Sequence, residues 1–215
     1  MDGTIIDSMW IWKELAHRSF TRKGLKVPED LAREMYAMNF LDAADYCIQR
    51  SGQEITKEQL VEEWTRDAIL MYDKEITLKP FTRELLTHLK SLGMTVCLTT
   101  ANYRDVAVKV LERFSLSPFF DSITVTQEVN AGKSQPDVFL LTASKHNIRP
   151  ERCIVFEDSY FAVQGAKAAG MSVVGVYDDF AKHTEFDMRQ LADDYIYSFE
   201  ELKARNPFTA CAQNA

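Results

Sequence analysis

Cysteine is scarce in this sequence of 215 residues, and its four copies are far apart. Cys47, Cys97, Cys153 and Cys211 form no Cys-x-x-Cys pair, the spacing typical of zinc sites and redox motifs. Cys97 and Cys153 lie in apolar runs, so we expect them to be small core residues. The four histidines also lack ligand spacing and are expected on solvated helix surfaces. The sequence therefore predicts neither a zinc site nor a redox site.

Long apolar runs and an excess of positive charge are also lacking. The sequence has no stretch long enough to span a bilayer and no signal peptide, so we expect a cytoplasmic protein with no membrane partner. A net charge of -7 and a pI near 5.2 argue against nucleic acid as a partner. An acidic chain would need a local cation cluster or a metal ion to accept a phosphorylated substrate.

The composition is that of a folded globular protein, with 46% hydrophobic and 27% charged residues. Its length allows one α/β domain or a core domain with a smaller inserted domain. Residues from about Met9 to Asp73 have helical periodicity and almost no strand signal. In this region Pro28 is expected at a helix start, and Thr56 followed by Gln59 predicts a capping box. One block of helices is therefore expected there.

From Pro80 onward, helical patterns alternate with short apolar runs. This alternation predicts βαβ units, and therefore an α/β fold with a Rossmann-like parallel sheet and helices on both faces. The helical block would then be a smaller, all-helical inserted domain. The predicted strands are MTVCLTT (94–100), SITVT (122–126), CIVFE (153–157), MSVVGVY (171–177) and a weak strand at 194–197.

Polar residues follow two of these strands, at the sheet edge where open α/β proteins bind their ligands. Thr100, Ala101 and Asn102 offer hydroxyl and backbone N–H groups at a helix N-terminus, an arrangement that can bind phosphate. Capping of that helix by Thr100 or Asn102 is the alternative explanation. Glu157 and Asp158 place two carboxylates where oxygen ligands could hold a hard cation. The alternative there is again a simple helix cap.

Four short segments, each weak alone, carry further polar residues: MDGT at 1–4, VCLTTAN at 96–102, GKSQPDVF at 132–139 and IVFEDS at 154–159. Lys133 of the third segment would, taken alone, be expected on the surface. Together, the order and spacing of the four segments resemble the motifs of the haloacid dehalogenase (HAD) superfamily. They are similar to its helical-cap subfamily, which includes β-phosphoglucomutase and phosphoglycolate phosphatase, although Ser134 departs from the usual proline.

This resemblance implies an Mg²⁺-dependent phosphatase that hydrolyses a small phosphorylated metabolite through an aspartyl-phosphate intermediate. Asp2 would be the general acid and base. The family's first motif reads Asp-x-Asp-Gly-Thr, so the nucleophilic aspartate and an apolar strand are expected just upstream of Met1. The implied metal ligands are Asp2, Glu157 and Asp158; the implied phosphate-binding residues are Thr100, Ala101, Asn102 and Lys133.

The resemblance also divides the chain into a core domain and an inserted all-helical cap. Residues 1–8 and 79–205 would form the core domain, 9–78 the cap that selects the substrate and 206–215 a tail. Trp10, Trp12 and Asn39 are candidate cap residues at the substrate. Trp10 and Trp12 are two positions apart on a helix and point to different faces, so at least one is expected in the cap core.

Two other functions stay open. The first is a phosphomutase of the β-phosphoglucomutase type, although that branch has valine in place of Thr4 and histidine in place of Trp12. The second is a non-catalytic binding protein on the same fold, because the nucleophile is absent from these residues. A dehalogenase is disfavoured, since that branch needs neither the Glu157–Asp158 pair nor Asp2. The substrate and the oligomeric state are not readable from the sequence.

Overall fold

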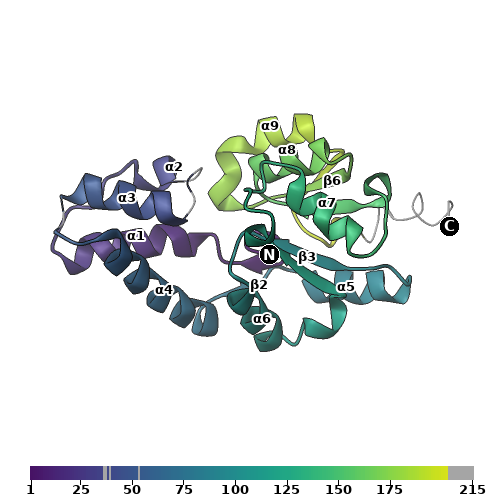
Figure 1. Ribbon diagram of the computed structural model, residues 1–215, viewed down its shortest axis with the longest axis horizontal. Helices are drawn as coiled ribbons and strands as arrows, with labels where there is room; N and C mark the ends of the chain where they lie inside the picture. Colours follow the sequence, from purple (N-terminus) through teal and green to yellow (C-terminus); the bar gives the residue numbers. More distant parts are fainter. Residues whose placement is uncertain (36–37, 39, 53, 203–215) are drawn as a thin grey trace. The chain divides into compact units, whose positions relative to one another are not determined.

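The computed structural model describes residues 1–35, 38, 40–52 and 54–202 (Figure 1). The chain divides into two compact units. The core unit comprises Met1–Asp7 and Thr77–Ala215, and the helical unit comprises Ser8–Ile76. No helix in the described residues is both long and apolar enough to cross a membrane.

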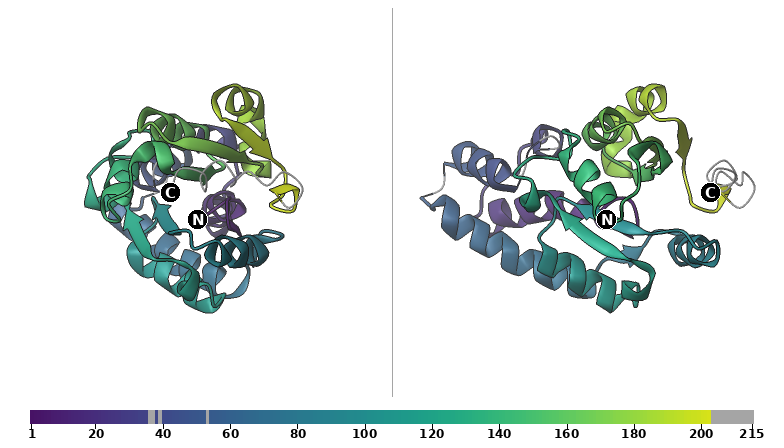
Figure 2. Two further views of the ribbon diagram at one scale, coloured as in Figure 1. Left: turned by 90° about the vertical axis from the view of Figure 1, so that its right-hand side faces the viewer. Right: turned by 45° about the vertical axis from the view of Figure 1, so that its right-hand side comes forward.

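The helical unit contains helices and turns, but no strand, in its described residues (Figures 1 and 2). The capping box at the last helix is confirmed, because Thr56 Oγ1 accepts from the N–H of Gln59 and Gln59 Oε1 accepts from the N–H of Thr56. The expected helix start at Pro28 is wrong. That helix begins at Leu31, after a turn in which Leu31 N–H donates to the Pro28 carbonyl. The helices are α1 (Trp10–Arg22), α2 (Leu31–Met35), α3 (Phe40–Ser51) and α4 (Lys57–Lys74).

Helices α1 and α4 pack together through large buried side chains. Phe20 of α1 and Trp64 of α4 are almost fully buried, and the Trp64 indole N–H donates to Ser19 Oγ over 2.5 Å. The buried carboxylate of Asp67 is paired with Arg22 at 2.6 Å. Burying these side chains stabilises the helical unit, and both polar groups keep a partner.

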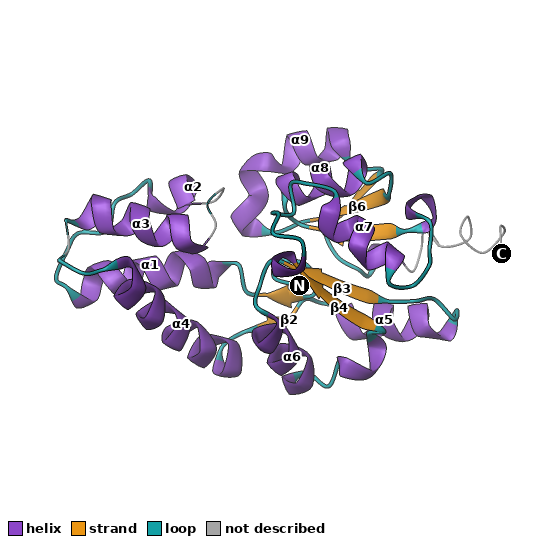
Figure 3. Ribbon diagram, viewed as in Figure 1, coloured by secondary structure: helices purple, strands orange, loops and turns teal. Residues whose placement is uncertain are grey.

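The core unit confirms the α/β prediction, because its five longer strands occur where the apolar runs predicted them and pair in parallel (Figure 3). They lie in two groups. In one, β3 (Cys97–Thr100) pairs with β4 (Ser122–Val125); in the other, β6 (Ser172–Val176) lies between β5 (Ile154–Glu157) and β7 (Asp194–Ile196). No strand of the described residues joins β3 to β5.

Helices flank both groups of strands. Helix α7 packs against β3 and β4, and α8 packs against β5 and β6. Helix α9, which follows a 3-10 segment at Asp179–Thr184, was not predicted, because its seven residues are too few to give a clear helical period. The helices are α5 (Thr82–Ser91), α6 (Arg104–Arg113), α7 (Asp137–Ser144), α8 (Tyr160–Ala168) and α9 (Glu185–Leu191).

The two chain segments that leave the core unit for the helical unit pair with each other. Strand β1 (Ile6–Asp7) is antiparallel to β2 (Thr77–Leu78), a ribbon that the sequence did not predict. The ribbon continues into the core, since the Ile5 carbonyl accepts from Lys79 N–H at 3.0 Å and from Thr82 Oγ1 at 3.1 Å. These bonds fix both connections at the edge of the core unit.

Candidate functional site

Two buried acids lie at the carboxyl end of β5. Glu157 is the last residue of the strand and Asp158 follows it, with exposed fractions of 4% and 3%. Thr4 Oγ1 donates a 2.7 Å hydrogen bond to Asp158 Oδ1. Burial, and then repulsion from Glu157, raise the pKa of Asp158 to about 7. Asp158 is therefore an acidic group whose negative charge is not balanced by the side chains around it.

The segment Met1–Thr4 wraps closely around the Asp158 carboxylate. Gly3 has a left-handed backbone, with φ +65°, and a Cβ at this position would lie 2.1 Å from Asp158 Oδ2. Any larger residue at position 3 would therefore both strain the backbone and collide with the carboxylate. This contact explains why the sequence needs glycine between Asp2 and Thr4.

The second acid, Glu157, is held by a cation. Lys133 Nζ forms an ion pair with Glu157 Oε2, and the N–H of Ser159 donates to Glu157 Oε1 at 3.1 Å. Burial pushes the pKa of Glu157 upward, but the charges of Lys133 and of the chain amino group outweigh burial and leave that pKa below its ordinary value. Glu157 is consequently a carboxylate that is already neutralised.

The turn that carries Lys133 packs against α8 without a side chain between them. A Cβ on Gly165 would lie 2.1 Å from the main-chain oxygen of Lys133 and 2.8 Å from that of Gln135. Glycine at this helix position lets the backbone of the turn approach the backbone of α8. This close approach fixes the position of the Lys133 backbone, from which its side chain extends. The sequence marked Lys133 as a candidate but gave no sign of this supporting contact.

Asp2 lies beside the residues that follow β3. Asn102 Nδ2 is 3.5 Å from Asp2 Oδ2, and the N–H of Asn102 donates to Thr100 Oγ1 at 3.1 Å. Thr100 is buried, whereas Ala101 is exposed and its carbonyl accepts from Gln127 Nε2 at 3.4 Å. The hydroxyl of Thr100 thus caps the turn at 100–102.

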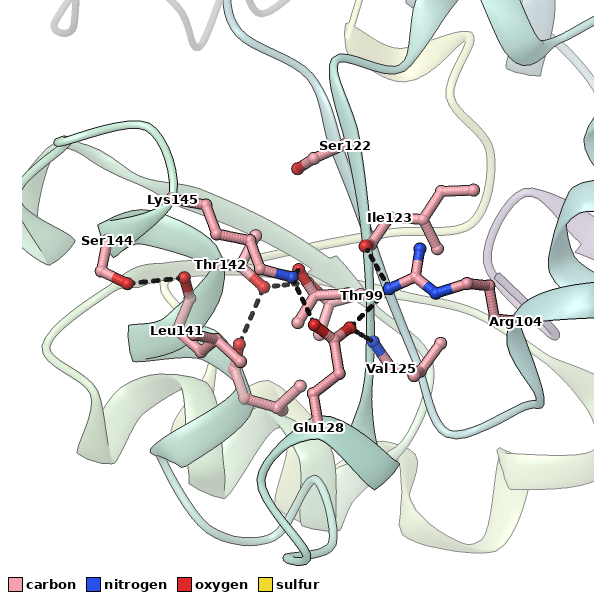
Figure 4. A network of polar contacts seen from close by, with 12 residues as sticks. Thr99, Arg104, Ser122, Ile123, Val125, Glu128, Leu141, Thr142, Ser144 and Lys145 are labelled. Carbon is pink, nitrogen blue, oxygen red and sulfur yellow. Dashed lines mark hydrogen bonds and ion pairs between the residues drawn. The ribbon is translucent and has the colours of Figure 1, made fainter.

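A polar network next to this turn fixes the start of α6 (Figure 4). Glu128 accepts from Arg104 and Lys145, each at 2.7 Å, and from the N–H of Val125 at 2.9 Å. Arg104 also donates to the carbonyl of Ile123. The network ties Arg104, the first residue of α6, to β4, and so holds the end of the turn at 101–103. No motif in the sequence indicated it.

The amino group of Met1 lies among the candidate residues. Burial, and then the charge of Lys133, lower its pKa, while the nearby carboxylates of Asp2, Glu157 and Asp158 act in the opposite direction. Contacts between side chains link the four sequence segments: Thr4 donates to Asp158, Lys133 pairs with Glu157, and Asn102 lies 3.5 Å from Asp2. The structure therefore brings predicted residues of all four segments together.

The described residues contain no group of three His, Cys, Asp or Glu side chains that could hold a metal ion by themselves. The acidic residues nonetheless fit Mg²⁺, which keeps several water ligands and needs only one or two carboxylates from the protein. Asp158 provides one, with a raised pKa that a bound cation would reverse. The carboxylate of Glu157, predicted as a further ligand, is engaged by Lys133 and Ser159 in this structure.

A second buried ion pair close by was missed by the sequence reasoning. Lys79 Nζ is 2.8 Å from Asp178 Oδ2 and donates to the Tyr177 carbonyl at 2.6 Å. Asp178 is one of the charges that raise the pKa of Asp158. The pair connects the end of the β2 segment to the loop after β6, a contact between residues too far apart for any sequence pattern to show.

The candidate cap residues belong to the helical unit. Trp10 and Trp12 are both half-buried on α1, with the fully buried Ile11 between them. Asn39 lies outside the residues that the structure describes. Their part in substrate selection stays a prediction.

Comparisons with known proteins agree with the predicted fold and family. A family model described as haloacid dehalogenase-like hydrolase matches residues 1–176. The phosphorylated carbohydrates phosphatase of Thermotoga maritima is 28% identical over 175 residues, covering 80% of this chain and 79% of that protein. Hexitol phosphatase B of Escherichia coli is 27% identical over 213 residues, covering 96% of this chain and 93% of that protein. The structure of β-phosphoglucomutase from Clostridium difficile matches with a TM-score of 0.77 at 21% identity, covering 99% of this chain and 94% of that chain.

Proposed function

This chain belongs to the haloacid dehalogenase-like hydrolase family, and we propose from that premise that it hydrolyses small phosphate monoesters with the help of Mg²⁺. Its relatives are named as phosphatases of phosphorylated carbohydrates and hexitols, which supports a sugar or sugar-alcohol phosphate as the substrate class. The observation that carries the proposal is the buried cluster in which Thr4 donates to Asp158, Lys133 pairs with Glu157 and Asn102 lies 3.5 Å from Asp2.

Charge balance in this cluster favours a bound cation. Lys133 neutralises Glu157, so the carboxylate of Asp158 is the excess negative charge. We assign Mg²⁺ to Asp158 and to the main-chain oxygen of Asp2. When bound, Mg²⁺ would neutralise charge on the phosphoryl oxygens during transfer. Glu157 would then hold Lys133 in place, where its ammonium group offsets repulsion between a phosphate and the attacking carboxylate.

Asp2 would move the proton in both steps. In the first step a carboxylate oxygen attacks phosphorus, and the bond between phosphorus and the ester oxygen of the substrate breaks. Asp2 gives its proton to this leaving oxygen. In the second step Asp2 takes a proton from water, which attacks the acyl phosphate and releases inorganic phosphate. Asn102, which lies 3.5 Å from Asp2, would orient this carboxyl group. The Thr100 turn would hold the phosphoryl oxygens through its hydroxyl and the N–H groups of Ala101 and Asn102.

The attacking carboxylate would belong to a residue bonded directly to the Met1 nitrogen. That nitrogen is buried beside Lys133, Asp2 and Asp158, so a residue joined to it would enter the cluster. Asp7, the other acid near this segment, has an exposed side chain in β1 and is a poorer candidate. The same acyl-phosphate chemistry would serve a mutase, but Thr4 and Trp12 depart from the mutase pattern.

The test is an assay with an aryl phosphate, with Mg²⁺ or with a chelator, on the protein extended by an aspartate before Met1. Asp158→Ala should abolish the Mg²⁺-dependent rate, whereas Asp179→Ala, an acid outside the cluster, should leave that rate unchanged. A panel of sugar phosphates, hexitol phosphates and phosphoglycolate would then rank the substrates. Conversion of β-glucose 1-phosphate to the 6-phosphate without release of phosphate would favour the mutase. No turnover of any ester would favour the non-catalytic binding protein.

A further inference from the structure

A third buried carboxylate lies at the sheet edge that carries Glu157 and Asp158. Asp178 is 6% exposed and follows Tyr177, the first residue after β6. Strands β5 and β6 are parallel neighbours with Glu157 opposite Gly175, so their carboxyl ends reach the same edge of the sheet. Asp158 and Asp178 therefore follow adjacent strands at the edge where ligands of open α/β proteins bind.

The charge of Asp178 acts on Asp158 across this edge. Burial and the charge of Glu157 are the largest causes of the raised pKa of Asp158, and the charge of Asp178 is a further cause. Interactions between charges are strong where water is largely excluded, and both carboxylates are buried. A net charge at Asp178 would therefore also act on a cation or a phosphate bound at Asp158.

Lys79 supplies the counter-charge for Asp178. Lys79 Nζ lies 2.8 Å from Asp178 Oδ2 and donates to the Tyr177 carbonyl at 2.6 Å. The other carboxylate oxygen of Asp178 accepts from the N–H of Phe180 at 2.9 Å. The side chains of Lys79 and Asp178 are 15% and 6% exposed, so water and salt screen the pair only weakly. Removing either partner would leave one buried charge uncompensated.

Main-chain contacts fix the position of Lys79. Its N–H donates to the Ile5 carbonyl at 3.0 Å, and the same carbonyl accepts from Thr82 Oγ1 at 3.1 Å. Ile5 directly follows Thr4, whose hydroxyl donates to Asp158. The backbone of Lys79 is thus tied to the segment that also contacts Asp158, which gives the ammonium group a defined place at this edge.

We propose that Lys79 is a positioning residue that neutralises Asp178, so that the edge at Asp158 accepts a phosphate dianion together with Mg²⁺. This inference rests on the Mg²⁺-dependent chemistry proposed above. An uncompensated Asp178 would attract the cation and repel the phosphate, because the two ligands have opposite charges. An uncompensated Lys79 would do the reverse. Loss of packing alone would weaken the binding of both ligands, so opposite shifts are specific to charge.

Calorimetric titration of the 215-residue chain with Mg²⁺ at pH 8 tests the effect on the cation. Lys79→Gln and Asp178→Asn each remove one charge, and each new amide keeps hydrogen-bonding groups. Lys79→Gln should bind Mg²⁺ about five- to tenfold more tightly than the wild-type protein, and Asp178→Asn about five- to tenfold more weakly. Asp179→Asn is the matched control, because it removes the same charge one residue further on at an exposed position. It should change the affinity by less than about twofold.

Titration with inorganic phosphate in saturating Mg²⁺ tests the effect on the anion. The order should reverse, with weaker phosphate binding by Lys79→Gln and tighter binding by Asp178→Asn. The double variant has no net charge at this position, so both affinities should return to within about twofold of the wild-type values. It also decides the matter if a single variant does not fold, because an affinity for Mg²⁺ about tenfold weaker in the double variant would overturn the proposal.

The outcomes separate this inference from the proposed function. Shifts of both single variants in the same direction, or no shift in either titration, would overturn the role of Lys79 and leave the Mg²⁺ site standing. A wild-type protein that binds no Mg²⁺ would refute that site and the inference together. Opposite shifts in a protein that hydrolyses no phosphate ester would refute the phosphatase and leave the charge compensation by Lys79 in place.

Discussion

The hydroxyl of Thr4 donates a 2.7 Å hydrogen bond to the carboxylate of Asp158, although the two residues are 154 positions apart. Both side chains are buried, with exposed fractions of 4% and 3%. This bond attaches the first residues of the chain to the end of β5. It also gives the buried carboxylate a polar partner, without which the cost of burying it would be greater.

Thr4→Val keeps the shape of the side chain and removes this donor. We expect the variant to lose about 1–3 kcal/mol of unfolding free energy, because a buried carboxylate loses a hydrogen bond. Thr4→Ser retains the hydroxyl and serves as the control for lost packing. Urea unfolding at pH 7.5 in a chelator measures both. A Thr4→Val protein as stable as the Thr4→Ser protein would show that the bond contributes nothing.

Asp158→Asn should change how stability depends on pH. The pKa of Asp158 is raised from an ordinary 3.8 to about 7 in the folded protein. Between these two pH values the folded protein therefore keeps the proton on Asp158, whereas the unfolded chain loses it. The metal-free protein should therefore lose stability as pH rises from about 4 to 7, and asparagine should remove that loss. At pH 8 the variant should be more stable by at least about 2 kcal/mol, since each pKa unit corresponds to about 1.4 kcal/mol.

The unfolding free energies of the wild-type protein and of Asp158→Asn are compared from pH 4 to 8, first in a chelator and then in millimolar Mg²⁺. A bound cation should remove the penalty in the wild-type protein, so the advantage of Asp158→Asn should shrink or reverse with Mg²⁺. If the two proteins have parallel stability profiles from pH 4 to 8 in the chelator, the assigned cause of the raised pKa is wrong.

Lys133→Met should be far more damaging than the same change at Lys145. Lys133 is paired with a buried glutamate, and its side chain is 15% exposed; Lys145 belongs to the more exposed Glu128 network. Removing one partner of a buried pair costs about 3–5 kcal/mol, against about 1 kcal/mol or less for an exposed pair. Chemical denaturation measures both losses. Adding Glu157→Gln to Lys133→Met should recover part of the loss, and no recovery would contradict the pairing.

Glu128→Gln tests the network that braces the turn at 101–103. Hydrogen bonding from Lys145, followed by that from the Val125 N–H, lowers the pKa of Glu128, so its stabilisation is present above the ordinary value of 4.5 and is lost as pH falls through the folded pKa. We expect the variant to be less stable at pH 7 by about 1 kcal/mol or less, given the exposure of these charges. The difference should shrink as pH falls below 4.5 and the carboxyl group takes up a proton. A constant difference over this range would show that charge is not its cause.

The strand ends were predictable because short apolar runs followed by polar residues are a local signal. That signal placed Thr100, Glu157 and Asp158 correctly at the ends of β3 and β5. The ribbon of β1 and β2 was missed, since strands of two residues have no detectable period. The start of α2 was misplaced because Pro28 begins a turn and not the helix itself.

The partners of the site residues were not predictable. From the sequence, Lys133 was predicted to bind the phosphate and Glu157 to bind the metal. Nothing in the sequence indicated that these two side chains pair with each other. Gly165 supports Lys133 from a position 32 residues further along the chain. Glu128 supports the turn that contains Asn102 from 26 residues further along. Such contacts depend on how distant segments pack, and a single sequence carries no record of that.

In the proposed mechanism, a carboxylate joined to Met1 attacks phosphorus while Asp2 and Asp158 support the reaction. The most direct measurement is the Mg²⁺-dependent release of phosphate from a hexitol phosphate by the protein extended by an aspartate before Met1, compared with the same extension ending in asparagine. We predict turnover by the aspartate form and a loss of about 10³-fold or more in the asparagine form, as expected when a nucleophile is removed. Equal turnover by the two forms, or by the 215-residue chain alone, would contradict the account.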